Sequence, residues 1–319
     1  MNPYFGKDGL QFVFLFVQRM FSMLTGQLSF AELAPDEVQI GALSLVALST
    51  ALVGTFLVLK KMTMLANALS HTILPGLVIA YLFSFSLTQG AEIYNLDMKT
   101  LLIASLATGI LTVASTQFLS RVFKLQEDAS IGLVSTTMVA LGVVLVTVFT
   151  RNTHLGIEAI MGNVDALHIN DLKLVFYVAC INIALISLFF KEFKIVAFDS
   201  LFAKTRGFSP TLWNYLLMLL TAMSVIGAFR AVGILLVLAL LVGPVLTARL
   251  FTHRLGKVIL LAMIIGIVAS FMSVALSRHC LSVYHVPLST SGMLATLLGL
   301  IYALCLLFKK EKSLYTQTT

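Results

Sequence analysis

The chain reads K-K-M-T-M-L-A-N-A-L-S-H-T-I-L-P-G-L-V-I-A-Y over residues 60–81. After the two lysines this stretch is apolar enough to lie in lipid, yet it contains Asn67 and His71, which share one face of a helix because they are four residues apart. Pro75 and Gly76 follow, and because proline has no backbone donor, carbonyls near residue 71 lose their usual partners. An imidazole, an amide oxygen and freed carbonyls at one depth suit a cation in transit.

A simpler interpretation of the same stretch stands beside this one. An ionisable side chain at membrane depth is costly, so it usually faces the protein interior or a water-filled path. His71 would satisfy that rule by bonding to a neighbouring helix, and Pro-Gly kinks are common in membrane helices. The stretch alone does not decide between a metal path and a structural histidine.

The composition defines the class of protein. The chain has 319 residues, of which 59% are hydrophobic and only 11% charged, and its mean hydropathy is +1.00. Because a soluble domain has about 25% charged residues, we expect a multi-spanning membrane protein. Basic cytoplasmic loops explain the net charge of +7 without nucleic acid.

A membrane span needs about 20 apolar residues, and nine stretches satisfy this length. They are residues 40–59, 64–87, 100–120, 129–149, 172–190, 211–229, 231–248, 258–277 and 288–308. The sequence therefore predicts an all-α polytopic membrane protein with about nine transmembrane helices, within a range of eight to ten.

The expected domain organisation follows from these stretches. A transmembrane domain covers residues 40–308, between an N-terminal segment (1–39) and a tail (309–319). Within the N-terminal segment, residues 10–24 are rich in Phe but short, and they contain a Gln and an Arg. They form either an interfacial helix or a tenth span, and we favour the interfacial helix.

Basic residues predict the orientation of the chain. Lysines and arginines fall in alternate connections, beginning with residues 60–61 and ending with the tail at 309–312. The intervening connections are neutral or acidic. The positive-inside rule therefore places the C-terminus in the cytoplasm and residues 150–171 outside.

The external connection has a candidate metal-receiving site. Asp165, His168 and Asp171 recur at every third residue, and carboxylate and imidazole groups bind divalent cations. The alternative is an ordinary solvated face.

The cytoplasmic connection, residues 191–210, predicts a short amphipathic helix. Asp199 is placed to cap its start, the helix runs to about Arg206, and Gly207 ends it. Its apolar face consists of Phe198, Leu201 and Phe202. Such a face must be buried either in a groove of a partner subunit or against lipid headgroups.

The seventh apolar stretch contains Gly243-Pro244, which we expect to break the helix as Pro75-Gly76 breaks the second. Paired interruptions indicate a transport site in transporters built from repeats. The chain has no G-x-x-x-x-G-K-[ST] phosphate loop, so we expect no ATPase activity in this chain. The apolar stretches contain no Asp or Glu away from their ends, which weighs against an ion-coupled carrier.

Several segments together resemble the permease subunits of bacterial ABC importers for zinc, manganese and iron. These segments are V-G-T-F-L-V-L-K-K-M-T-M-L-A-N-A-L-S-H-T-I-L-P-G (53–76), E-D-A-S-I-G (127–132), M-G-N-V-D-A-L (161–167), F-D-S-L-F-A-K-T-R-G (198–207) and V-G-I-L-L-V-L-A-L-L-V-G-P-V-L-T-A-R-L (232–250). The resemblance implies a multi-pass protein of the bacterial inner membrane, working as a homodimer or heterodimer of permeases. It also implies cytoplasmic ATPase subunits that hold the ATP, an external metal-binding protein, and no tightly bound cofactor.

The resemblance also assigns roles to residues. Residues 198–207 look like the coupling helix that docks on the ATPase. The family usually has Asp where this chain has Asn67, followed by the matching His71, so this chain lacks a negative charge that would help hold the ion. We therefore expect the permease subunit of an ATP-driven importer for a divalent transition metal. The alternative is a secondary transporter or channel for a cation without an ATPase partner.

Overall fold

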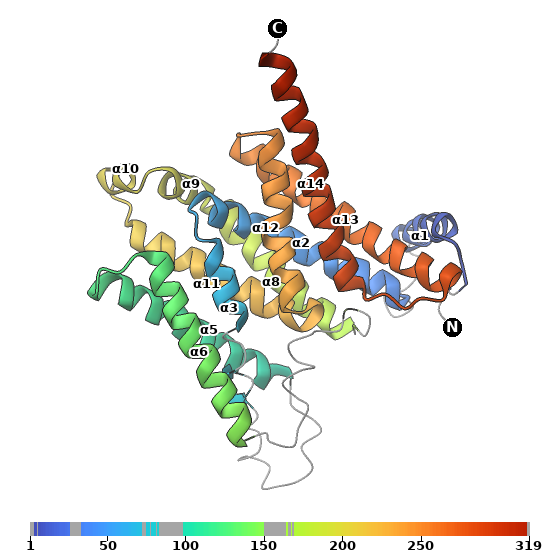
Figure 1. The fold of residues 1–319 in the computed structure, drawn as a ribbon. Coiled ribbons are helices and arrows are strands. Elements are labelled where there is room, and N and C mark those ends of the chain that lie inside the picture. Colours follow the sequence, from blue (N-terminus) through green and yellow to red (C-terminus); the bar gives the residue numbers. More distant parts are fainter. Residues whose placement is uncertain are drawn as a thin grey trace. The chain divides into compact units, whose positions relative to one another are not determined.

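The computed structural model describes residues 3–4, 6–25, 33–71, 75–76, 78–80, 82, 98–149, 164, 167 and 169–317, which contain helices and no strand. The chain as far as residue 188 forms α1 (Gly9–Leu24), α2 (Pro35–Leu59), α3 (Thr63–His71), α5 (Met98–Val122), α6 (Glu127–Phe149) and α8 (Ile169–Leu188) (Figure 1). The remainder of the chain forms α9 (Phe190–Phe198), α10 (Ser200–Thr205), α11 (Pro210–Val232), α12 (Ile234–Phe251), α13 (Leu255–Tyr284) and α14 (Thr290–Gln317).

Seven helices in the described part of the chain are long and apolar enough to cross a membrane. The spans are Pro35–Leu59, Ile103–Val122, Glu127–Leu145, Asp171–Leu188, Pro210–Phe229, Leu255–Tyr284 and Thr290–Lys309. α12 adds a shorter apolar helix at Leu236–Phe251, and α3 covers the start of the predicted second span. The prediction of an all-α polytopic membrane protein is confirmed.

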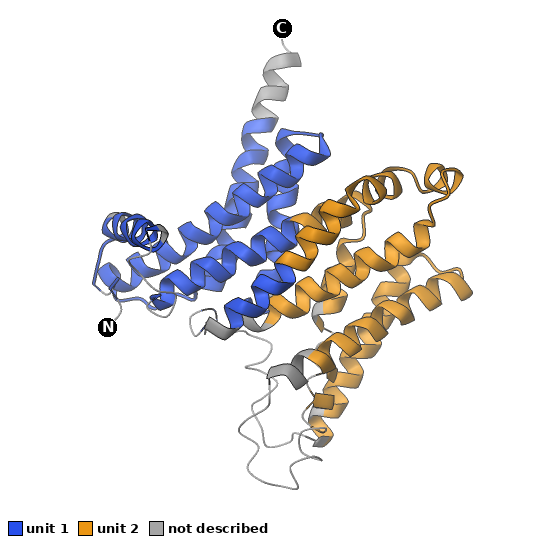
Figure 2. Cartoon of the chain, turned by 180° about the vertical axis from the view of Figure 1, so that it is seen from behind, with its two compact units in different colours: residues 1–51, 163–179, 231–319 blue, residues 52–162, 180–230 orange. Residues whose placement is uncertain are grey.

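The chain divides into two compact units (Figure 2). One contains residues 1–51, 163–179 and 231–319, and the other contains residues 52–162 and 180–230. Three of the four boundaries fall inside helices, namely α2, α8 and α11.

Small residues allow close helix packing in the first unit, where α12, α13 and α14 pack on one another. A Cβ added at Gly266 of α13 would lie 2.9 Å from the Cβ of Ala47 of α2, closer than such atoms approach. Ser270 and Ser273 of α13 are fully buried and donate hydrogen bonds to carbonyls of their own helix. This is the packing expected where lipid supplies no hydrophobic driving force between helices.

The predicted break at Gly243-Pro244 is wrong, because α12 continues through both residues to Phe251. Proline removes one backbone hydrogen bond, which a helix packed among others tolerates. The Thr247 hydroxyl also donates to the Gly243 carbonyl at 2.9 Å. The interruption lies earlier, at Gly233, whose φ of 83° separates α11 from α12 and suits glycine.

Candidate functional site

α3 presents Asn67 and His71 on one open face. Both belong to the continuous helix Thr63–His71, so they lie one turn apart, as the spacing predicts. Asn67 is exposed and His71 is half-buried among the residues that the structure describes. Met64, one turn before Asn67, is 61% exposed and extends the same face.

The opposite face of α3 is buried. Its side chains are at most 2% exposed: Leu65, Ala66, Ala68 and Leu69. α3 packs against α6 within the same unit. Packing therefore fixes which way the helix is turned, and it leaves the imidazole and the amide on the uncovered side.

Gly76 allows the second span to approach α5. A Cβ at this position would lie 2.6 Å from the Thr108 hydroxyl and 2.9 Å from the Cα of Ser105. Pro75 and Gly76 are buried and helical. Residues 72–74 lie outside the described residues, so a helix break before Pro75 remains a prediction.

The predicted external metal-receiving site cannot be placed, because Asp165 and His168 lie outside the described residues. Asp171 is described and is buried in the first turn of α8. Among the residues that the structure describes, no three His, Cys, Asp or Glu side chains come together as a metal cluster.

α10 forms as its capping residues predict. The Asp199 carboxylate accepts hydrogen bonds from the backbone N–H groups of Leu201 and Phe202 at 2.9 and 3.0 Å. At the other end, Gly207 has a φ of 82°. Gly207 N donates to Lys204 O and Phe208 N donates to Ala203 O, both at 3.0 Å, which is a Schellman motif.

The apolar face of α10 is exposed. Leu201 is 73% exposed and Phe202 47%, and Phe198, the last residue of α9, is 59% exposed beside them. Ala203, on the inner face of α10, is fully buried. An exposed cluster of large apolar side chains at a capped, rigid helix is typical of a protein or membrane contact.

α9, which the sequence does not predict as a separate helix, holds α10 in place. Phe193 of α9 is buried, and its ring lies 5.6 Å from that of Phe56 in α2 and 5.3 Å from that of Trp213 in α11. Phe189, at the start of α9, also lies 5.3 Å from Trp213. These rings fix α9, and with it α10, to the ends of two membrane helices.

A polar contact joins the same region to α3. The Lys60 ammonium donates a hydrogen bond to the side-chain oxygen of Asn214. Lys60 lies in the turn between α2 and α3, and Asn214 lies in the first turns of α11, shortly after α10. Burial lowers the pKa of Lys60, and the carboxylate of Glu127 partly opposes this. The only sequence signal for this contact was one Asn in an apolar stretch and one Lys of a pair.

Two solved structures have a fold similar to that of this chain. One, described as "PsaBC from Streptococcus pneumoniae in complex with Fab", is 24% identical, covers 86% of this chain and 92% of that chain, and has a TM-score of 0.69. The other, described as "An inward-facing conformation of a putative metal-chelate type ABC transporter", is 14% identical, covers 84% of this chain and 86% of that chain, and has a TM-score of 0.63.

The sequence then assigns the family. The profile of the ABC 3 transport family matches residues 38–309, and the chain belongs to this family. A protein of Chlamydia trachomatis described as "Probable metal transport system membrane protein" is 41% identical over 312 residues, which cover 98% of this chain and 95% of the relative. The chain therefore spans nearly all of this relative.

Proposed function

We propose that this chain is the membrane permease of an ATP-driven importer that carries a divalent transition metal ion, zinc, manganese or iron. The family supports the transport role, and the description of the chlamydial relative supports a metal as the cargo. ATP would bind to separate ATPase subunits, and the permease itself would carry no resident cofactor.

The observation that carries this proposal is the open face of α3. An imidazole and an amide in one turn of a membrane helix are costly against lipid, and in the described part of the chain Asn67 is exposed and His71 half-buried. A second permease chain across a two-fold axis would cover them and contribute the same groups again. Two His71 imidazoles and two Asn67 amides would then provide four donors, a number that suits zinc and related ions.

The weakness of such a site serves transport. His71 is an imidazole ligand and Asn67 is neutral, so the site contributes no fixed negative charge of its own. A permease must release its ion on the far side, and a set of anionic ligands would hold it. An external metal-binding protein would deliver the ion and set much of the selectivity.

The contact with the ATPase and the orientation in the membrane follow from α10 and from the charges of the loops. The exposed face of α10 suits a groove on an ATPase subunit. The alternation of basic connections supports a cytoplasmic C-terminus in a bacterial inner membrane.

The test is His71→Ala in the complete transporter, with Met64→Ala as the matched control. Met64 lies on the same open face but has no ligand nitrogen. We expect His71→Ala to reduce manganese or zinc uptake by roughly 10- to 100-fold while the subunits still co-purify, and Met64→Ala to transport normally. Undiminished uptake by His71→Ala would refute the path role.

A further inference from the structure

We propose that α1 lies flat in the surface layer of the membrane, where α2 begins, with one face in the acyl chains of the lipid. This inference does not depend on the transported ion. α1 has 16 residues and is about 24 Å long, which is shorter than the hydrocarbon core of about 30 Å.

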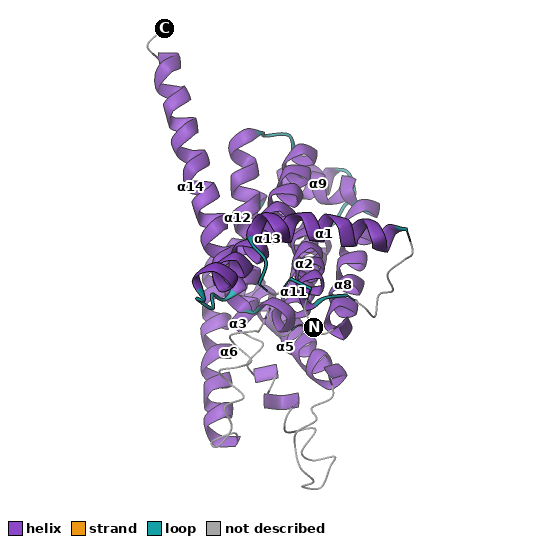
Figure 3. Ribbon diagram, turned by 90° about the vertical axis from the view of Figure 1, so that its right-hand side faces the viewer, coloured by secondary structure: helices purple, strands orange, loops and turns teal. Residues whose placement is uncertain are grey.

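The direction of α1 relative to two membrane helices of its own unit indicates this placement. Figure 1 shows α13 and α14 along their lengths and α1 foreshortened, whereas Figure 3 shows α1 along its length, pointing in a direction steeply inclined to that of α14. α13 and α14 are both candidate spans. A helix whose axis is steeply inclined to the axes of both spans lies close to the plane of the membrane.

One face of α1 is fixed to α13. Phe12 is 1% exposed, and its ring lies 6.3 Å from that of Phe271; the ring of Phe16 lies 5.1 Å from the same residue. At the start of α1, the Gly9 N–H donates to Nδ1 of His279 at 3.2 Å. α1 is therefore packed on its neighbour and is not a loose arm.

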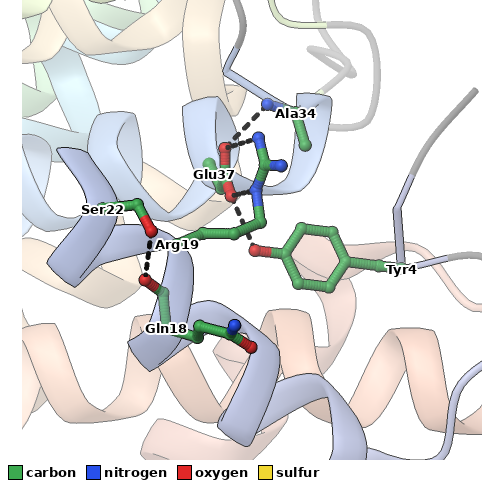
Figure 4. Close-up of polar contacts among 6 residues, drawn as sticks. All are labelled: Tyr4, Gln18, Arg19, Ser22, Ala34 and Glu37. Atoms are coloured by element: carbon green, nitrogen blue, oxygen red, sulfur yellow. Dashed lines mark hydrogen bonds and ion pairs between the residues drawn. The ribbon is translucent and has the colours of Figure 1, made fainter. Parts of the chain in front are cut away.

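A buried polar cluster joins α1 to the first turn of α2, as Figure 4 shows. The Glu37 carboxylate accepts from Nε of Arg19 at 2.5 Å, from the Tyr4 hydroxyl at 2.7 Å and from the Ala34 N–H at 2.8 Å. Burial and the bond to Glu37 raise the pKa of Tyr4, so its hydroxyl keeps the proton that it donates.

A second ion pair lies beside that of Arg19 and Glu37. Nε of Arg278 in α13 donates to the carboxylate of Asp36, the residue before Glu37, at 2.6 Å. Two acids thus meet two arginines where α1, α2 and α13 come together. Paired charges are what a site beside lipid requires, and the cluster leaves the rest of α1 to face outward.

The outward surface of α1 has two different sides. At 100° per residue, Phe14, Val17 and Phe21 share one side, and they are 74%, 61% and 68% exposed. The polar side chains Gln11 and Gln18 are exposed on the adjacent side. An apolar side next to a polar side, on a helix in the membrane plane, is typical of an interfacial helix.

Lipid is the occupant that the neighbouring surface favours. α13 exposes Val268 and Met272 at 49% and 48%, on either side in sequence of the Phe271 ring that α1 covers. The exposed side of α1 thus borders the apolar surface of a membrane span, and its large side chains offer no polar group to a protein partner.

Tryptophan substitution with brominated lipids tests the placement. Phe14→Trp, Val17→Trp and Phe21→Trp are each reconstituted as the full chain in phosphatidylcholine vesicles brominated near the carbonyl end or near the methyl end of the acyl chains. The parent chain, with its single tryptophan Trp213, sets the baseline, and Gln18→Trp is the matched control on the polar side.

We expect the three apolar positions to be quenched above the baseline, to similar extents, and more strongly by bromine near the carbonyl end. Gln18→Trp should be quenched less by both lipids. Preference for opposite depths at positions 14 and 21 would mean that α1 crosses the membrane, and would overturn the proposal. Absence of added quenching at all three positions would mean that protein or water covers this face, and would also overturn it.

Discussion

Asn67 presents a neutral amide on the same face as the His71 imidazole. An amide oxygen binds a divalent cation through its dipole alone, whereas a carboxylate adds a full charge. If the proposed site is shared by two chains, this difference is doubled. On that proposal, the identity of residue 67 sets how tightly the ion is held during passage.

Asn67→Asp should tighten metal binding. We expect the Kd for manganese to fall by about tenfold, equivalent to about 1.4 kcal/mol, and the maximal uptake rate to fall because release becomes slower. Titration calorimetry on the purified complex measures the first effect and uptake at saturating metal the second.

Met64→Asp is the control for this change, because it adds the same charge one turn away on the open face. Equal tightening by both variants would show a general effect of charge and would remove Asn67 from the ligand set.

The turn before α3 is connected to the region that follows α10. The bond between Lys60 and Asn214 and the aromatic contacts of Phe193 connect α10, α11 and α3 within one unit. A displacement of α10 by a bound ATPase would reach the helix with His71 through these contacts.

Lys60→Met should weaken this connection. A hydrogen bond to a charged group contributes about 1.5–3 kcal/mol, so we expect the number of metal ions transported per ATP to fall by roughly tenfold while ATP hydrolysis continues. Uptake and phosphate release measured on the same vesicles give this ratio.

Two further variants make the result specific. Lys61→Met removes the neighbouring exposed lysine and should leave the ratio unchanged, and Asn214→Asp should preserve it because a carboxylate still accepts from Lys60. A normal ratio in Lys60→Met would show that the contact does not transmit motion.

The exposed apolar face of α10 leads us to a prediction about assembly of the permease with the ATPase subunit. Phe202→Asp places a charge in the apolar contact, and loss of a central interface residue costs about 2 kcal/mol or more, so we expect binding of the ATPase to weaken by at least about thirtyfold. Co-purification from detergent extracts measures this. Ser200→Asp adds the same charge on the other side of α10 and should not release the ATPase; release by both variants, or by neither, would exclude docking through Phe202.

Local signals explain which elements the sequence predicts. The ends of α10 follow from Asp199 and Gly207, whose side chain and φ act within a few residues of themselves. α9 was missed because Phe189 precedes it without a side-chain cap and its position depends on rings from α2 and α11. The break at Pro244 was wrong because a packed membrane helix tolerates proline.

In the candidate site too, local sequence signals predict the spacing of residues but not the packing between helices. The spacing of Asn67 and His71 predicts a shared face, but only the packing of α3 on α6 leaves that face uncovered. The polar cluster of Glu37 and Arg19 joins residues from two helices, and no periodicity in either helix indicates it.

The distribution of charge along the membrane spans indicates the source of energy for transport. Acidic residues of the described spans lie in first turns, as Asp36, Glu37, Glu127, Asp128 and Asp171 do. A proton- or sodium-coupled carrier usually places carboxylates deep in its spans. The work of transport should therefore reach this chain from a subunit outside the membrane.

We accordingly expect the permease alone, reconstituted in vesicles, to take up manganese or zinc no faster than empty vesicles, with or without an imposed proton gradient. Addition of the ATPase subunit, the external binding protein and ATP should produce accumulation against a gradient, and a non-hydrolysable ATP analogue should not. The analogue matters because it separates docking from turnover: it allows the ATPase to bind at α10 but gives no repeated cycle. Uptake by the permease alone, driven by the proton gradient, would contradict the ATP-driven mechanism and would favour a secondary carrier, in which the imidazole of His71 moves protons as well as metal.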